Sequence, residues 1–273
     1  MRRLLGAALL AAAGLAAAQD TGTVFEAPYV PSPSSTVDEM LRLAELGPAD
    51  VVYDLGAGDG RVVIAAASKF GARGVGVEID GELVAMARAN AVRAGVADRV
   101  RFLQQDMFAT DLREATVVAL YLSPNLNLRL RPALLALKPG TRVVSHSSGM
   151  GDWHPDRSTA IRKEVLLWIV PAQVAGRWHA TLGSGPQARE LELEFAQRYQ
   201  DVSASATLDG AQARVWEARL QGDRLSFVIV EYLGTEREAG LYFEGRVTKD
   251  AIEGTARRGV GAAPEVLAWR ARR

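Results

Sequence analysis

The residues of this chain best suited to chemistry are three carboxylates, each placed at the end of an apolar run. Asp54 opens a glycine-rich turn, and Glu78 and Asp106 end or follow later runs of β-branched and apolar residues. An apolar run, an acid, a glycine turn and an alanine-rich helical pattern, in that order, predict the opening of a doubly wound α/β sheet. Ligands bind beyond the carboxyl ends of the strands in such sheets. We therefore expect the three carboxylates to meet at a ligand site.

The spacing of the glycines indicates which ligand binds. They stand at Gly56, Gly58 and Gly60 and are followed by Arg61, so the turn departs from the G-x-G-x-x-G spacing of dinucleotide-binding proteins. The pattern Asp54-x-Gly-x-Gly-x-Gly resembles motif I of the class I, seven-β-strand methyltransferases that use S-adenosylmethionine (SAM). The resemblance implies a Rossmann-like, mostly parallel sheet, with SAM as the cofactor.

The resemblance also implies roles for single residues. Asp54 would hold the amino-acid part of SAM, against which the backbone of the three glycines lies. Glu78 would accept hydrogen bonds from the ribose hydroxyls, and Asp106 would accept one from the adenine amino group, with Met107 beside the ring. An ordinary glycine turn with a solvated Glu78 is the alternative, and an Asp after a strand is often a turn former.

The segment before motif I narrows the resemblance. Tyr29-Val-Pro-Ser-Pro precedes a helical pattern for which Thr36 is the predicted N-cap, with Glu39 completing a capping box. Together with motif I, this order resembles the lysine methyltransferases that modify the ATP synthase c subunit and the adenine nucleotide translocase, and their bacterial relatives. The resemblance implies that Tyr29, Pro31 and Ser32 line the SAM site. Tyr29 fits a packing role equally well.

The predicted fourth and fifth strands deliver polar residues to the same edge. Tyr121 and Asn125 follow the fourth strand in a Ser-Pro-Asn sequence, which departs from the Asn-Pro-Pro-aromatic form of many amino-methylating relatives. Asn125 would orient an acceptor amine, or cap a helix. His146 would remove a proton from an ammonium group, or be a hydrogen-bonded structural residue. Trp153 would wall an alkylammonium site, or cover the core.

The composition is that of a soluble globular protein. The 273 residues are 48% hydrophobic and 23% charged, with a formal net charge of zero. The absence of basic blocks speaks against a nucleic-acid partner. There is no cysteine and there are only three histidines, so disulfides, thiolate catalysis and a metal site are not expected.

The first residues read as a targeting segment. Two arginines, an apolar run and an Ala-x-Ala ending predict a signal peptide over residues 1–18, followed by an extended segment over 19–34. Export implies a secreted or periplasmic protein without a membrane span after cleavage. A cytoplasmic or membrane-anchored protein is the alternative. Export raises the question of where SAM would come from, because SAM is made in the cytosol.

The spacing of apolar residues changes after the predicted methyltransferase domain, residues 35–172. Helical periods give way to seven or eight short alternating runs, separated by turn signals such as Asp209-Gly210. They predict an antiparallel barrel or sandwich over residues 173–273. Trp178 near its start and Trp269-Arg270 near its end resemble the Trp–Arg pair of lipocalin barrels.

The sequence thus predicts a SAM-dependent methyltransferase with a C-terminal β domain. The resemblance favours a nitrogen acceptor such as a protein lysine. A small-molecule methyltransferase is one alternative. Another is an exported binding protein with a lipocalin-like barrel, whose first domain binds nucleosides without turnover.

Overall fold

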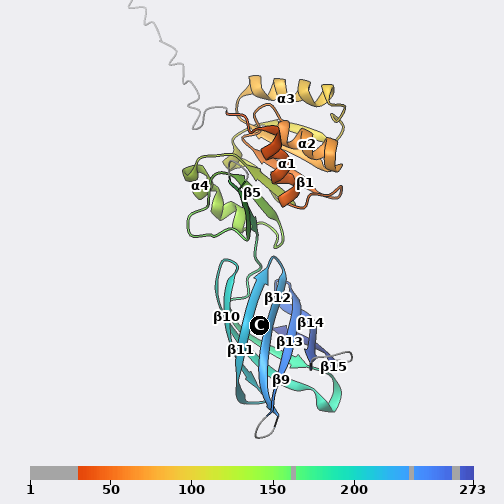
Figure 1. Cartoon of the computed structure of the whole chain (residues 1–273), viewed down its shortest axis with the longest axis vertical. Helices are drawn as coiled ribbons and strands as arrows, with labels where there is room; N and C mark the ends of the chain where they lie inside the picture. The colour runs from red at the N-terminus through yellow and green to blue at the C-terminus, as the bar shows by residue number, and fades with distance from the viewer. Residues whose placement is uncertain (1–29, 161–163, 234–236, 260–264) are drawn as a thin grey trace, which may run out of the picture.

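The computed structural model describes residues 30–160, 164–233, 237–259 and 265–273 as two bodies, a sheet flanked by helices and a β-barrel (Figure 1). Tyr29 and the predicted signal peptide lie outside the described residues. The longest described helix has 13 residues. None of the described helices combines the length and apolar character that crossing a bilayer requires.

A seven-stranded sheet with the order β3-β2-β1-β4-β5-β7-β6 forms the first body. Strands β1 to β5 run parallel, and β7 runs antiparallel to both β5 and β6. The strands are β1 (Val51–Leu55), β2 (Arg73–Glu78), β3 (Val100–Gln104), β4 (Val117–Leu120), β5 (Arg142–His146), β6 (Arg157–Ala160) and β7 (Glu164–Ile169). The predicted Rossmann-like, mostly parallel sheet is confirmed. The sequence analysis missed β6, a four-residue edge strand.

Helices cover both faces of this sheet, because successive strand side chains point to opposite sides. The helical elements are α1 (Ser34–Leu43), α2 (Arg61–Phe70), α3 (Gly81–Arg93), α4 (Pro124–Leu135) and the 3₁₀ turn η1 (Met107–Ala109). Val52 of β1 packs in one core with α1, α2 and α3. Its neighbours Val51 and Tyr53 pack in another core with α4. Both faces of β1 are therefore buried, as its continuous apolar sequence predicts.

Helix α1 begins at Ser34, so the prediction of Thr36 as its N-cap is wrong. The carbonyl of Pro33 accepts the backbone N–H groups of Thr36 and Val37 at 3.0 Å, and no side chain caps the helix. Pro33 itself is extended, with ψ of 145°. The helix thus starts directly after the proline, and Thr36 lies inside its first turn.

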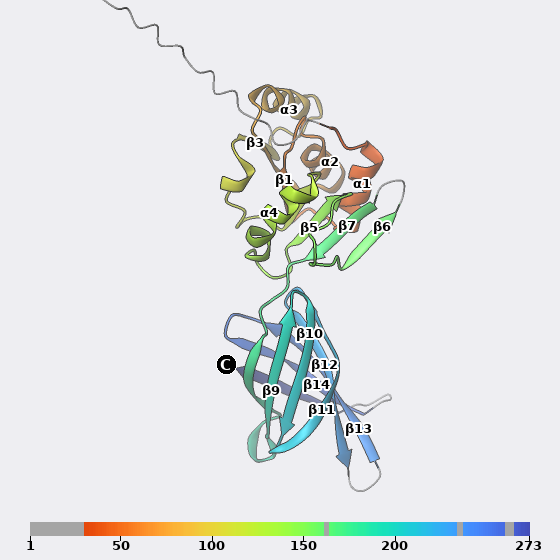
Figure 2. The ribbon, with the colours of Figure 1, turned by 90° about the vertical axis from the view of Figure 1, so that its left-hand side faces the viewer.

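The second body is a closed barrel of eight antiparallel strands, which confirms the all-β prediction (Figure 2). The strands are β8 (Gly176–Leu182), β9 (Arg189–Arg198), β10 (Asp201–Leu208), β11 (Ala211–Gln221), β12 (Arg224–Leu233), β13 (Arg237–Val247), β14 (Ala251–Arg258) and β15 (Glu265–Arg272), with the 3₁₀ turn η2 (Gly185–Gln187). Each strand pairs with the next along the chain, and β15 pairs with β8. Closure leaves the barrel without an open edge.

Aromatic side chains fill the barrel interior. Phe227 stacks on Phe243 with ring centroids 4.6 Å apart, and Trp269 meets both rings edge-on. The guanidinium of Arg273 lies 4.7 Å from the Trp178 ring centroid, whereas Arg270 pairs with Glu253 outside. The expected Trp–Arg contact is therefore present, but it is made by the last residue of the chain.

The barrel meets the first body at the amino-terminal end of the sheet strands (Figure 2). Gly222, in the β11–β12 turn, accepts a hydrogen bond from the Ala172 N–H at 2.8 Å. A Cβ on Gly222 would lie 2.9 Å from the Cα of Gly140, just before β5. The barrel consequently sits away from the carboxyl ends of the strands, where a doubly wound sheet binds its ligand.

The β9–β10 turn makes a second junction. Asp152 of the first body accepts hydrogen bonds from Arg198 at 2.6 Å and Tyr199 at 3.1 Å, which hold the pKa of Asp152 below its usual range. Trp153 donates from its indole N–H to Gln200 at 3.0 Å and is 1% exposed. Of the two interpretations for Trp153, the structure supports the core residue.

Candidate functional site

A cleft of about 580 Å³ opens at the carboxyl ends of β1, β2, β3 and β4. This volume lies in the range of small-molecule sites. The cleft is lined by residues of five segments: 30–32 before α1, 54–62 with the glycine turn, 77–83 after β2, 105–108 after β3, and 121–129 at the start of α4. The three predicted carboxylates, Asp54, Glu78 and Asp106, all line it.

The glycines of the turn serve different purposes. Gly56 has a φ of 81° and lines the cleft, and a Cβ on it would lie 3.2 Å from Leu122. Gly60 also has a φ of 81°, but a Cβ there would lie 2.7 Å from the Phe102 ring. Gly60 thus permits helix α2 to pack on β3 and is not among the residues that line the cleft. The prediction that Gly60 contacts the cofactor directly finds no support in this geometry.

Gly58 and Glu78 hold each other in place. The backbone N–H of Gly58 donates to one carboxylate oxygen of Glu78 at 2.9 Å, and the N–H groups of Ile79 and Asp80 donate to the other at 2.8 and 3.1 Å. The oxygen that accepts only the Gly58 N–H keeps a further lone pair, because a carboxylate oxygen has two. Glu78 is therefore a fixed acceptor on the cleft wall, and Gly58 supports it from behind without lining the cleft.

Asp54 is a buried carboxyl group at the floor of the cleft, with an exposed fraction of 4%. Burial, followed by the negative charges of Glu78 and Asp59, raises its pKa from 3.8 to about 7. A buried carboxylate surrounded by other acids is costly unless a cation approaches it. The site is thus arranged to receive a positively charged group next to Asp54.

Asp106 combines the two roles that the sequence left open. Its side chain accepts the N–H of Phe108 at 2.9 Å and so caps the η1 turn, and it lines the cleft as well. Met107 lines the cleft beside it and packs partly against the core under α4. The turn thus holds both side chains on the wall of the cleft.

The segment before α1 closes one side of the cleft. Val30, Pro31 and Ser32 line it, and the Ser32 carbonyl accepts a hydrogen bond from Arg61 at 2.7 Å. Arg61 is held in turn by Asp59, at 2.9 and 2.7 Å. Sequence reasoning missed Arg61 and Asp59 as site residues, although both stand within the motif I turn.

The acceptor-side residues are only partly brought together. Tyr121 lines the cleft, and its ring stacks on that of His146 with centroids 4.1 Å apart. His146 is fully buried, and its Nδ1 lies 3.1 Å from the Ser32 hydroxyl. Asn125 is exposed on the first turn of α4 and does not line the cleft. Ser123 caps α4 by accepting the Leu126 N–H.

Comparison with known proteins identifies the first body. The model of the ANTKMT methyltransferase domain matches residues 54–157. A protein-lysine N-methyltransferase of Saccharolobus islandicus is 46% identical over 130 residues, which are 47% of this chain and 81% of that protein. The chain belongs to this methyltransferase family. The adenine nucleotide translocase lysine N-methyltransferase of mouse is 36% identical over 48% of this chain and 57% of its own length.

A solved structure of another methyltransferase matches the same part of the chain. It is an RNA methyltransferase of Salinibacter ruber in complex with S-adenosylhomocysteine, 54% identical, with a TM-score of 0.52. It covers 53% of this chain and 96% of its own. The family model ends at residue 157 and so leaves the barrel outside.

The protein is a SAM-dependent methyltransferase, and the cleft fits its cofactor. SAM carries an ammonium group, a ribose and an adenine. The cleft offers the buried carboxyl of Asp54, the fixed acceptor Glu78 and the η1 turn with Asp106, in chain order along its wall. Within the described residues, no group of three or more His, Cys, Asp or Glu side chains is placed to hold a metal ion.

Two further features of the site were not predicted. Arg129 of α4 lies 4.1 Å from the Phe108 ring centroid, and both residues line the cleft. Asn127, rather than Asn125, is the buried amide of α4. It donates to the Ser145 hydroxyl at 3.3 Å and to the Ser148 carbonyl at 3.0 Å, and so ties the segment after β5 to α4.

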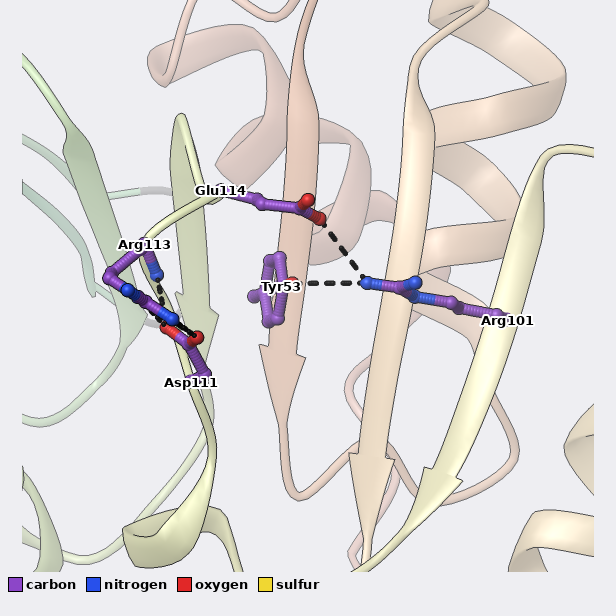
Figure 3. A network of polar contacts seen from close by, with 5 residues as sticks. All are labelled: Tyr53, Arg101, Asp111, Arg113 and Glu114. Carbon is purple, nitrogen blue, oxygen red and sulfur yellow. Dashed lines mark hydrogen bonds and ion pairs between the residues drawn. The ribbon is translucent and has the colours of Figure 1, made fainter.

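A polar network borders a shallow groove next to the cleft (Figure 3). Arg101 of β3 donates to the Tyr53 hydroxyl at 3.3 Å and to Glu114 at 3.4 Å. Arg113 donates to Asp111 at 2.9 Å and lowers the pKa of that carboxyl to about 2. These pairs hold the β3–β4 connection in place. In this connection the η1 turn stands where a helix would otherwise cover the sheet.

Proposed function

We propose that this enzyme transfers methyl groups from SAM to the side-chain nitrogen of protein lysines. The observation that carries the proposal is the 46% identity to an archaeal protein-lysine N-methyltransferase, over 81% of that protein. Two mouse relatives, named for lysines of the adenine nucleotide translocase and of the ATP synthase c subunit, support it at 36% and 35% identity.

In this proposal the three carboxylates at the carboxyl ends of β1, β2 and β3 hold the cofactor. Asp54 would bind the ammonium group, Glu78 the ribose hydroxyls, and Asp106 the adenine amino group with Met107 beside the ring. The backbone of Gly56 would lie against the bound molecule because it carries no Cβ. SAM supplies a methyl group on a positively charged sulfur. The protein then contributes chiefly by positioning the acceptor in line with that methyl group.

The charge of the cleft favours an amine over a phosphorylated acceptor. Its lining has five carboxyl groups against two guanidinium groups: Asp54, Asp59, Glu78, Asp80 and Asp106 against Arg61 and Arg129. An acidic cleft attracts ammonium groups and repels a phosphate backbone. At the acceptor end, the Tyr121 ring would contact the alkylammonium chain.

An RNA acceptor is the second candidate, favoured by the Salinibacter ruber structure at 54% identity. The whole chain has no net charge, whereas proteins that bind the RNA backbone usually present a basic surface. The experiment should therefore offer both acceptors to the same enzyme preparation.

The test is methyl transfer from SAM labelled in its methyl group. The chain from Gln19 to Arg273 would be incubated with protein fractions of the native host, with total RNA and with a small-molecule extract. Label in protein, mapped by mass spectrometry to lysine, supports the proposal. Label only in RNA or only in small molecules refutes it. Asp54→Asn is the matched control and should abolish transfer to every acceptor.

A further inference from the structure

A buried serine–histidine pair lies against the cleft. The Ser32 hydroxyl is 3.1 Å from Nδ1 of His146, and the exposed fractions of the two residues are 5% and 0%. Ser32 lines the cleft together with Tyr121. The Tyr121 ring stacks on the imidazole at 4.1 Å and 26°. The pair thus connects the acceptor end of the cleft to a buried base.

Lysine methylation needs such a base. A lysine side chain is an ammonium ion at neutral pH, because its ordinary pKa is about 10.4, and an ammonium has no lone pair with which to attack. Histidine changes its charge near neutral pH and is the usual proton acceptor in enzymes. The chain has three histidines. His179 lies on barrel strand β8, and His154 is bound to the barrel through Gln200.

We propose that Ser32 and His146 form a proton relay for the acceptor amine, an inference that rests on the proposed lysine specificity. The ammonium gives one proton to the Ser32 hydroxyl as Ser32 gives its own to Nδ1 of His146. The lone pair freed on the amine forms the new N–C bond while the S–C bond of the donor breaks, and its electron pair stays on sulfur. After the product leaves, the imidazolium returns its proton through the Ser32 hydroxyl to solvent in the cleft, which Ser32 lines. Each turnover yields a methylated ammonium, a neutral thioether and one proton.

The surrounding contacts fix the pair in the orientation that a relay requires. The Ser32 carbonyl is held by Arg61 at 2.7 Å, so the Ser32 backbone is anchored independently of the hydroxyl. Stacking on Tyr121 holds the plane of the imidazole. The relay requires Nδ1 to accept from the Ser32 hydroxyl, with the ring proton on Nε2. Tyr121 is the titratable group packed on the imidazole, and Arg61 is the cation on the Ser32 side.

The test compares kcat at pH 7 and pH 9.5 for Ser32→Ala, Ser32→Thr and His146→Phe. Poly-L-lysine and a peptide carrying the mapped lysine would serve as acceptors. At pH 7 we expect Ser32→Ala and His146→Phe to lose about a hundredfold in kcat, a typical contribution of proton transfer. At pH 9.5 the deficit should shrink to about tenfold or less, because about a tenth of the lysine is then already neutral, against fewer than about one in a thousand at pH 7. Ser32→Thr keeps the hydroxyl and should retain most of the activity.

A structural role would give a different result, because a misplaced wall is not repaired by alkaline pH. A deficit of the same size at both pH values, or no deficit, overturns the relay. His179→Phe is the matched control, since it makes the same change on the exposed barrel surface. If His146→Phe does not fold, the comparison of Ser32→Ala with Ser32→Thr decides alone. A wild-type enzyme that methylates no lysine overturns the proposed function and the relay together, whereas an active wild type with pH-independent deficits overturns the relay only.

Discussion

Binding of SAM should release a proton from Asp54 at slightly acidic pH. Burial and the charges of Glu78 and Asp59 raise the pKa of this carboxyl from 3.8 to about 7, so the apoenzyme holds it mostly protonated at pH 6. The ammonium group of SAM is charged at that pH, since an α-amino group has an ordinary pKa near 7.7–8.0. A cation next to Asp54 favours its ionised form, and the proton must then leave.

The expected size follows from the pKa. About nine tenths of the Asp54 carboxyls carry a proton at pH 6 and about one tenth at pH 8. Calorimetric titration with SAM, repeated in buffers of different ionisation enthalpy, counts the protons. We expect about 0.9 proton released per SAM at pH 6. The affinity should rise close to tenfold from about pH 5.5 to 6.5 and level off above about pH 7.5.

The same shift makes the ionised Asp54 costly to the folded apoenzyme. Its folded pKa lies above the unfolded value, so the folded chain binds more protons between pH 3.8 and about 7. The contribution of Asp54 to stability therefore falls as the pH rises through this window and stays low above it. Three pKa units correspond to about 4 kcal/mol at most. Asp54→Asn should raise the Tm of the apoenzyme at pH 8 and abolish SAM binding.

Two outcomes would refute this reasoning. One is a SAM affinity that is flat between about pH 5.5 and 7.5 without proton release. The other is an Asp54→Asn variant that binds SAM like the wild type. Asp111→Asn is the control: this carboxyl lies outside the cleft, and its pKa of about 2 keeps it ionised throughout the range, so its removal should leave the proton count unchanged.

Three further predictions concern packing, the junction between the bodies and the N-terminus. Gly60→Val should lower stability by about 2–4 kcal/mol, because it adds left-handed strain to a collision with Phe102; a Tm like that of Gly149→Ala, whose Cβ meets open space, would contradict this. Asp152→Ala removes the acceptor of two hydrogen bonds across the junction and should broaden the distances between the bodies in solution scattering without changing SAM affinity. N-terminal sequencing of the protein from its host should start at Gln19 if the signal peptide is cleaved; an intact Met1 would overturn the predicted cleavage.

Most of the fold prediction rested on local patterns of apolar and polar residues. Alternating and continuous apolar runs predicted the strands of both bodies, because strand side chains alternate between buried and exposed faces. The segment 157–160 was missed because its Arg-Ser-Thr-Ala sequence has no such pattern and pairs only with β7. Thr36 was assigned as a cap from local chemistry, whereas the backbone direction set by Pro33 decided where α1 starts.

The predictions for the site divide in the same way, into those that local sequence supports and those that depend on packing. Asp54, Glu78 and Asp106 could be placed at one edge because each stands at the end of a parallel strand, and the carboxyl ends of such strands lie together. Asn125 and Asn127 are two residues apart on α4, and no local signal told which one turns inward. The same holds for Arg270 and Arg273, of which only the second reaches Trp178.

The order of strand, acid, glycine turn and helix by itself determined the fold class, the cofactor and the carboxylates that face it, because these depend on residues close together in the chain. Only the tertiary structure decided that Ser32 lies on His146, 114 positions away. It alone also decided that burial and two neighbouring acids raise the pKa of Asp54, and that the barrel packs at the far end of the sheet. Contacts and burial of this kind depend on which distant elements pack together, and no short stretch of sequence specifies that.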